Sequence, residues 1–330
     1  MHKLSGASLF AVGFALILAV ILWIATTAPP ATMFSNPAFA QYRGKQIDYF
    51  ALGDSVASGH GLDGATGKCL QSSKAYPYTV SDALKRRYHK VNFPPQHHLA
   101  CSGAKVGNLQ GQVDYVVKHL SADHPTLVSI TIGANDFEFY KEKKMKKLLL
   151  PRRTGVIGGG TSEADFKKWA DAKATEVKNQ LQPAVTRLIL KPKVVVVITD
   201  YYNPMNKKAA KFVAPRIGPA STELCGTCRP RFGYAIAQLN GAFVDVSDAL
   251  ENPAQLALTG DLQPKDAVPI RESFVDHEAP HQYRLHTCGK ASPGLDGTWI
   301  QPYPDCIHPN EEGAVQIGKT VNLEAYRAGR

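Results

Sequence analysis

Charged side chains are missing from the first part of this 330-residue chain. No Asp, Glu, Lys or Arg occurs between Leu4 and Tyr42, and the run from Ala7 to Ala25 is almost wholly apolar, after a short start that contains Lys3. A segment of this kind indicates export from the cytosol. We therefore divide the chain into an N-terminal signal peptide or membrane anchor with a linker, residues 1–40, and one catalytic domain, residues 41–330.

The apolar run does not decide whether the segment is removed. About 19 apolar residues is long for a signal-peptide core and close to the minimum for a membrane span. Ala38-Phe39-Ala40 has the small-x-small form of a cleavage site, but it lies about 15 residues beyond the run. Cleavage and retention both remain open. In either case Lys3 favours a cytoplasmic N-terminus, so we expect a domain that is secreted or anchored to the outer face of the cytoplasmic membrane.

Cysteine is scarce, and its number is even. The six residues are Cys69, Cys101, Cys225, Cys228, Cys288 and Cys306. In an exported chain an even set favours disulfides over free thiols. Connectivity does not follow from the sequence; one scheme pairs neighbours in order along the chain. A second CxxC motif is missing, and zinc on Cys225-Gly-Thr-Cys228 remains the alternative. We expect no metal and no organic cofactor.

The formal charge of +10 is concentrated in part in one basic cluster, residues Lys141 to Arg153. Its members are Lys141, Lys143, Lys144, Lys146, Lys147, Arg152 and Arg153, opposed only by Glu142. Aromatic residues are not interleaved with these charges, so nothing indicates a nucleic-acid reader. The cluster is either a solvated surface or a contact for an anionic surface. We expect a monomer.

Internal repeats and long biased segments are also absent. Apolar runs rich in branched residues instead alternate with helical patterns. The predicted strands are Ile47 to Leu52, Leu127 to Ile132, Val194 to Thr199 and Ala242 to Val246, with a short one at His98 to Cys101. The predicted helices are Tyr76 to Tyr88, Val106 to Leu120, Glu163 to Leu190, Arg231 to Asn240 and Glu311 to Tyr326. The alternation predicts a three-layer α/β/α fold around a central, mostly parallel five-stranded sheet.

The first predicted strand runs directly into Gly53-Asp54-Ser55. Working groups in such sheets gather at the carboxyl ends of the strands, where a following helical turn directs backbone N–H groups at an anion. Ser55 is therefore placed like a nucleophile. A lone Ser at this position is more often a turn or cap residue, so the motif needs partners. We expect Asp54 to fix the turn through hydrogen bonds to nearby backbone.

Two further strand ends supply hydrogen-bond donors for an oxyanion. Leu127 to Ile132 leads into Gly133-Ala134-Asn135-Asp136, which puts the amide of Asn135 at the same edge of the sheet. The short strand at His98 to Cys101 leads to Gly103, where the backbone can approach a ligand closely. Preorganised donors of this kind stabilise the transition state of acyl transfer.

A general base is expected in Asp305-Cys306-Ile307-His308-Pro309, just ahead of the last helix. An Asp three residues before a His can accept from its Nδ1–H and leave Nε2 for the proton of Ser55. His60 is the alternative base. It follows Ser55 closely in the sequence but has no obvious orienting carboxylate.

The ordered set Gly53-Asp54-Ser55, Gly103, Gly133-Ala134-Asn135-Asp136 and Asp305-x-x-His308 resembles the four blocks of the SGNH (GDSL) hydrolase superfamily. Over about residues 46 to 325 the chain is most similar to secreted Streptomyces-type esterases and lipases. The resemblance implies a flavodoxin-like fold, Ser55 as nucleophile, His308 as base and then acid, and Asp305 as the orienting group. The implied oxyanion hole comprises the Ser55 and Gly103 N–H groups and the Asn135 side chain.

Two details of that resemblance bear on this chain. In some secreted members a backbone carbonyl beside a Trp replaces the orienting carboxylate, and Trp299-Ile300-Gln301 stands in a comparable place. The family also pairs its six cysteines in order, which implies Cys69 with Cys101, Cys225 with Cys228 and Cys288 with Cys306. Gly-x-Ser-x-Gly is lacking around Ser55, so the nucleophile elbow of the α/β-hydrolases does not apply.

The leading hypothesis is hydrolysis of a carboxylic ester, on an acyl lipid or an acylated polymer, through an acyl-Ser55 intermediate. An O-deacetylase acting on an extracellular polysaccharide would use the same residues. A third interpretation, from another class, is a non-catalytic protein that binds envelope lipids, suggested by the export segment and the basic cluster. The sequence does not specify acyl length or the alcohol.

Overall fold

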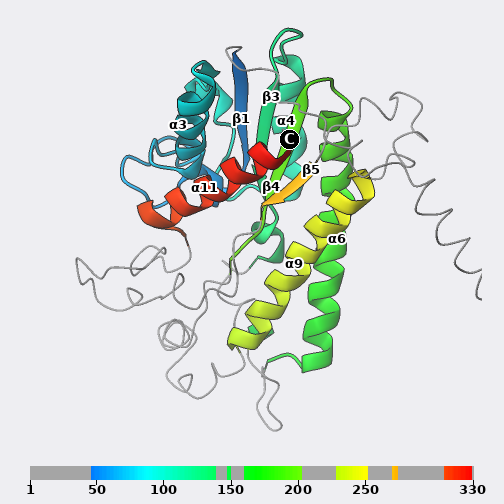
Figure 1. Ribbon diagram of the computed structural model, residues 1–330. Coiled ribbons are helices and arrows are strands. Elements are labelled where there is room, and N and C mark those ends of the chain that lie inside the picture. The colour runs from blue at the N-terminus through cyan, green and yellow to red at the C-terminus, as the bar shows by residue number, and fades with distance from the viewer. Residues whose placement is uncertain are drawn as a thin grey trace, which may run out of the picture. The chain divides into compact units, whose positions relative to one another are not determined.

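The computed structural model describes residues 46–138, 147–149, 160–202, 228–251, 270–273 and 308–328 (Figure 1). The predicted export segment, and all of the basic cluster except Lys147, lie outside these residues. The described residues belong to one compact unit, which spans Pro37–Arg330. Among the residues that the structure describes, no helix is both long enough and apolar enough to cross a bilayer.

A parallel five-stranded sheet forms the centre, in the order β2-β1-β3-β4-β5. The strands are β1 (Ile47–Gly53), β2 (Val91–Asn92), β3 (Thr126–Thr131), β4 (Val194–Thr199) and β5 (Ile270–Ser273). Because β2 has two residues, the other four strands make up most of the sheet. Every residue of β1, β3 and β4 is buried, as expected for parallel strands that are covered on both faces.

Helices cover both faces of this sheet and give three layers (Figure 1). The helices are α2 (Ser55–Ser58), α3 (Tyr76–Tyr88), α4 (Leu109–Lys118), α6 (Glu163–Ile189), α9 (Cys228–Glu251) and α11 (Glu311–Ala328). The single turns are η3 (Pro95–His97), η4 (Val106–Asn108) and η5 (Ala134–Phe137). Helix α11 packs against α3, while α6 packs against α4 and α9. The arrangement confirms the predicted α/β/α fold class.

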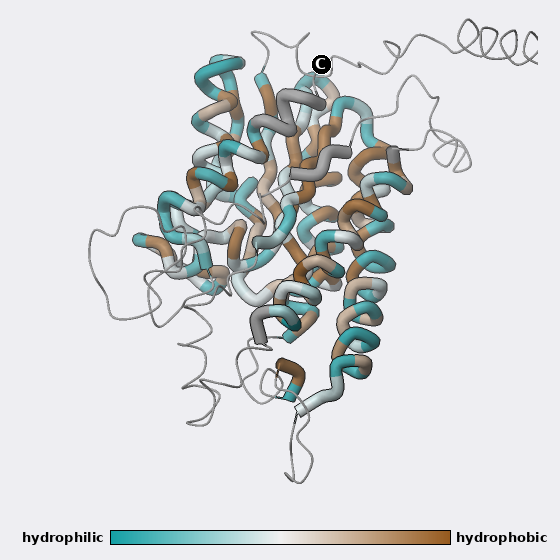
Figure 2. Tube along the Cα trace, turned by 60° about the horizontal axis from the view of Figure 1, so that its bottom comes forward, coloured by the Kyte–Doolittle hydropathy of each residue, from teal (hydrophilic) through white to brown (hydrophobic). Residues whose placement is uncertain are grey.

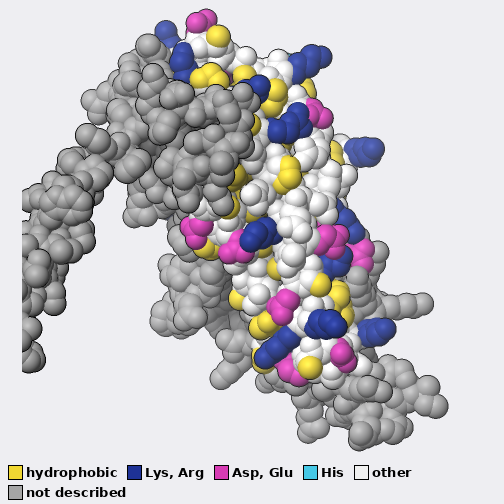
Figure 3. Space-filling model, turned by 90° about the vertical axis from the view of Figure 1, so that its right-hand side faces the viewer, with side chains coloured by type: hydrophobic (Ala, Val, Ile, Leu, Met, Phe, Trp, Pro, Cys, Tyr) yellow, Lys and Arg dark blue, Asp and Glu magenta, His cyan; other side chains and the backbone are white. Residues whose placement is uncertain are grey.

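The core follows from the periodicity of these helices. In α3, Tyr76, Val80, Leu84 and Tyr88 recur every four residues and are buried. Figure 2 shows the hydrophobic positions concentrated along the strands and the adjoining sides of the helices. On the face seen in Figure 3, basic and acidic side chains are interspersed instead of separated by sign.

Two predicted strands are wrong. The run Ala242 to Val246 lies inside α9, where Leu239, Phe243, Val246 and Leu250 bury one helical stripe. A run of five residues, four of them apolar and one Asp245, is too short for its periodicity to separate a strand from a buried helix. The predicted helix Arg231 to Asn240 therefore continues straight through it.

The segment His98 to Cys101 follows the edge of β1 without becoming a strand. His98 makes one isolated bridge with Ala51, and the N–H groups of Leu99 and Ala100 both donate to the Ala51 carbonyl, at 2.8 and 3.1 Å. Two donors on one carbonyl interrupt the regular ladder. The edge position next to β1 is instead taken by β2, which, like β5, was not predicted.

Candidate active site

The turn after β1 is held against the end of β3. Gly53 has a φ of +132°, and a Cβ at this position would lie 2.0 Å from the carbonyl oxygen of Thr131. The N–H of Asp54 donates to that same oxygen at 2.8 Å. Only glycine allows two backbones to approach so closely in this conformation. Ser55 follows as the first residue of α2, and its side chain is partly exposed.

Asp54 is the buried cap of the helix that carries Ser55. Its Oδ1 accepts from the Val56 N–H at 3.0 Å, as the sequence led us to expect. Its Oδ2 accepts from the hydroxyl of Tyr201, just beyond β4. Burial raises the pKa of Asp54 to about 6, although the bonds from Tyr201 and Val56 and the charge of His308 act to lower it.

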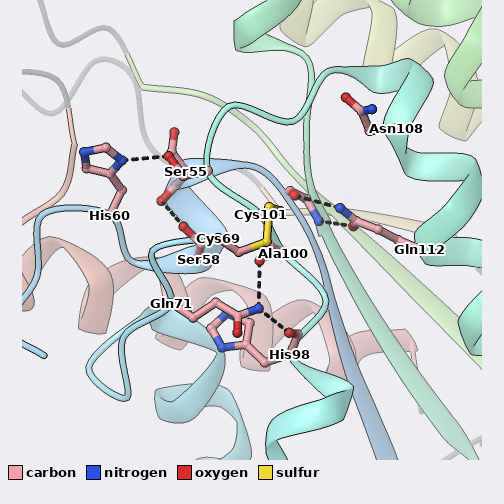
Figure 4. The surroundings of a disulfide bond; sticks show 12 residues. Ser55, Ser58, His60, Cys69, Gln71, His98, Ala100, Cys101, Asn108 and Gln112 are labelled. Atoms are coloured by element: carbon pink, nitrogen blue, oxygen red, sulfur yellow. Dashed lines mark hydrogen bonds between the residues drawn. A yellow bond between two sulfur atoms is a disulfide. The ribbon is translucent and has the colours of Figure 1, made fainter. Parts of the chain in front are cut away.

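Gln112, on α4, holds the nucleophile turn, Gly53 to Ser55, from another side. Its Oε1 accepts from the Gly53 N–H at 2.7 Å, and its Nε2 donates to the Gly53 carbonyl at 3.1 Å (Figure 4). Sequence reasoning missed both Gln112 and Tyr201. Tyr201 follows a predicted strand end, which was a usable signal, whereas nothing marked Gln112 within its helix.

The predicted oxyanion donors lie on three loops that are bonded to one another. Gly103 is exposed with a φ of +82°, and an added Cβ would meet nothing within 4 Å. Asn135 lies in η5, and its Nδ2 donates to the Ala104 carbonyl at 2.9 Å, which uses one of the two N–H bonds of the amide. The backbone N–H groups of Ser55 and Gly103 donate to no residue that the structure describes. Open backbone donors beside a nucleophile are what an oxyanion hole requires.

A disulfide joins the loop after α2 to the Gly103 loop, residues Cys101 to Ala104. Cys69 and Cys101 are bonded, which confirms this predicted pair (Figure 4). The Ser102 N–H donates to the Cys69 carbonyl at 3.0 Å, and the Cys101 N–H donates to the Gly53 carbonyl at 2.9 Å. The disulfide and these two hydrogen bonds therefore connect the Gly103 loop to Gly53, before Ser55, and to Cys69, after α2.

The other cysteine pairs stay predictions. Cys225, Cys288 and Cys306 lie outside the described residues, and Cys228 is described only as the first residue of α9. In the described ranges no group of three or more His, Cys, Asp or Glu could hold a metal ion.

His308, although distant in sequence, lies close to the nucleophile turn. It is partly exposed, and its ring stacks on that of His60 with centroids 4.5 Å apart and planes 8° from parallel. His60 in turn donates its backbone N–H to the Ser55 carbonyl at 3.0 Å. The structure thus brings the two candidate bases together beside the turn that carries Ser55. Asp305 and Trp299, the candidates for orienting His308, lie outside the described residues.

The position of His308 follows from how α11 begins. The Asn310 side chain accepts from the Gly313 N–H at 2.9 Å and caps the helix two residues after His308. Gly318 allows α11 to approach α3, because a Cβ there would lie 2.6 Å from the Cβ of Thr79. Lys74 forms an ion pair with Glu311, in the first turn of the helix. These contacts fix the start of α11, and with it the neighbouring histidine.

The chain was compared with solved structures, curated proteins and family models. Among solved structures, a lipolytic protein of the G-D-S-L family from Veillonella parvula shares 11% identity over 85% of this chain and 98% of its own, with a TM-score of 0.38. Axe2, an acetylxylan esterase from Geobacillus stearothermophilus, shares 14% identity over 85% of this chain and 94% of its own, also at 0.38. Similarity at this level supports no argument about fold, activity or substrate. Among curated proteins no significant match is found.

The sequence itself matches a family model. Residues 49–321 match the model described as GDSL-like Lipase/Acylhydrolase. The matched region contains the nucleophile turn, the Gly103 loop, η5 and His308. Because the match covers most of the chain, the protein belongs to the GDSL-like lipase and acylhydrolase family of hydrolases.

Proposed function

We propose that this protein is an exported esterase that hydrolyses carboxylic esters through an acyl-Ser55 intermediate. The observation that carries the proposal is the convergence of a partly exposed Ser55, open backbone donors and the His308 imidazole at one edge of the sheet. Membership of an acylhydrolase family supports the reaction class.

In the proposed mechanism Ser55 Oγ attacks the ester carbonyl while His308 takes the hydroxyl proton. The oxygen of the tetrahedral intermediate accepts hydrogen bonds from the Ser55 and Gly103 N–H groups and the Asn135 amide. Collapse of the intermediate expels the alcohol, which receives the proton from His308. Water then attacks the acyl-enzyme by the same route in reverse, and the carboxylic acid leaves. Each hydrogen-bond donor is expected to contribute about 3–4 kcal/mol to the barrier reduction.

The test is hydrolysis of p-nitrophenyl esters from acetate to palmitate by the full-length protein. We expect Ser55→Ala and His308→Ala to lower turnover by about three orders of magnitude or more. Ser73→Ala, at an exposed serine beyond the site, serves as the matched control and is expected to retain activity. The chain-length optimum separates an esterase or polysaccharide O-deacetylase from a lipase. Full activity in Ser55→Ala would disprove the mechanism.

Export is a separate part of the proposal. The uncharged segment from Leu4 to Tyr42 supports it, and the proposal is a catalytic domain that lies outside the cytoplasmic membrane. Alkaline phosphatase fused after residue 45 is expected to be active in an intact bacterial host, and an inactive fusion would contradict export. The intact mass of the mature protein then tells whether residues 1–40 are removed or retained as an anchor.

A further inference from the structure

The rings of His60 and His308 stack on each other, although the two residues lie near opposite ends of the catalytic domain in the sequence. The rings lie 4.5 Å apart and are within 8° of parallel, so they meet face to face. Face-to-face contact leaves the edges of both rings, and hence their nitrogen atoms, outside the stack. Nδ1 and Nε2 of His308 thus lie at the edge of its ring and not in its contact with His60.

His60 is itself held on the side of the nucleophile. Its Nδ1 lies 2.7 Å from the hydroxyl oxygen of Ser102, and its backbone N–H donates to the Ser55 carbonyl at 3.0 Å. Ser102 is in turn fixed next to Cys101, which is bonded to Cys69. The His60 ring is thus anchored to both the nucleophile turn and the Gly103 loop, independently of the C-terminal segment that brings in His308.

From this arrangement we propose that His60 is a positioning residue that holds the imidazole of His308 in the plane required for proton transfer from Ser55. The inference deepens the proposed esterase function and rests on it. A ring that lies flat on an anchored neighbour cannot rotate about χ2 without losing the contact, so the stack restricts His308 to one plane. Restriction of this kind lowers the barrier without adding an interaction with the substrate.

The role predicts a specific pattern among variants of the full-length protein. His60→Ala removes the stack and is expected to lower kcat for p-nitrophenyl acetate by about 10- to 100-fold, with KM changed by less than about threefold. His60→Phe keeps a flat ring and is expected to recover to within about fivefold of the wild-type kcat. Ser102→Ala removes the anchor and is expected to give an intermediate loss.

A double variant separates positioning from a general structural effect. If His60 acts through His308, His60→Ala is expected to cause no further loss in a His308→Ala background. The rate of Ser55 labelling by a fluorophosphonate probe, which needs an activated serine but no ester substrate, provides the second readout. His119→Ala, at an exposed histidine on the far end of α4, is the control and is expected to leave both rates unchanged.

The outcomes distinguish the two levels of the proposal. Wild-type kcat and labelling in His60→Ala, with Ser55→Ala inactive, would overturn the positioning role and leave the esterase standing. Equal losses in His60→Ala and His60→Phe would also overturn it, because the ring plane would then not matter. Absence of both ester hydrolysis and probe labelling in the wild type would overturn the esterase and this inference together.

Discussion

The hydroxyl of Tyr201 donates a hydrogen bond to the buried carboxylate of Asp54, directly before Ser55 in the chain. Tyr201 is fixed in turn by Asn240 of α9, whose side chain accepts from the Tyr201 N–H and donates to its carbonyl, both at 2.9 Å. A chain of hydrogen bonds therefore runs from α9 to the cap of the helix that carries Ser55. The Tyr201 hydroxyl donates most strongly to Asp54 when this carboxyl is ionised.

The first prediction concerns pH. Burial raises the pKa of Asp54 to about 6, so the carboxylate accepts from both Val56 and Tyr201 above this pH and loses an acceptor below it. Because the Tyr201 bond lowers this pKa, Tyr201→Phe is expected to raise it further. The acid limb of the kcat profile, measured between pH 4 and 9, is then expected to move to higher pH. Tyr234→Phe removes an exposed hydroxyl and is the control. An acid limb that is unchanged in Tyr201→Phe would mean that Asp54 does not govern it.

The second prediction tests the clamp on the nucleophile turn. Gln112→Leu removes both hydrogen bonds to Gly53 and leaves its N–H without this partner, which is expected to cost about 1–3 kcal/mol of unfolding free energy and to lower kcat. Gln110→Leu is the matched control on the same helix, since Gln110 contacts an exposed Arg187. Its cost is expected to be below about 0.5 kcal/mol. Chemical denaturation measures both, and equal costs would contradict the clamp.

The elements predicted correctly are those whose signal is local. β1, β3 and β4 are mostly apolar runs rich in branched side chains, although β1 contains Asp48 and β3 contains Ser129. The Ser55, Gly103 and Asn135 loops follow from the rule that strand ends share one edge of the sheet. α3 and α6 appear because their helical periodicity is long enough to recognise. Ala242 to Val246 failed for the opposite reason, since a short apolar run inside a helix reads like a strand.

The rest depends on contacts between distant residues. Tyr201 and Asp54 are 147 positions apart, and Gln112 and Gly53 are 59 apart, so no local pattern connects them. His60 was considered only as a rival to His308, because the sequence says nothing of the face-to-face contact between their rings. Sequence reasoning therefore found the candidates for chemistry but not the side chains that hold them in place.

The third prediction compares two glycines with positive φ. Gly53→Ala would place a methyl group 2.0 Å from backbone oxygen, and we expect this variant not to fold. Gly103→Ala meets open space and retains the N–H, so only the cost of its backbone conformation applies, about 1–2 kcal/mol. Thermal melts distinguish the two. A folded Gly53→Ala with wild-type stability would show that β1 and β3 can separate at their ends.

The last prediction concerns a buried histidine and stability in acid. His98 is buried and donates from Nε2 to the Ala57 carbonyl at 2.9 Å, and burial lowers its pKa. The unfolded chain therefore binds a proton near pH 6.5 that the folded chain does not, so this residue makes stability fall as the pH decreases below that value, by up to about 1.4 kcal/mol per pH unit. Asp54 acts in the opposite sense, because its raised pKa favours the folded state at low pH.

The contribution of His98 is isolated by comparison with His98→Gln, which keeps a donor but does not titrate. We expect the variant to be less stable than wild type at pH 7 and the difference to shrink by pH 5, as followed by urea denaturation. A difference that stays constant would show that His98 is protonated equally in the folded and unfolded states.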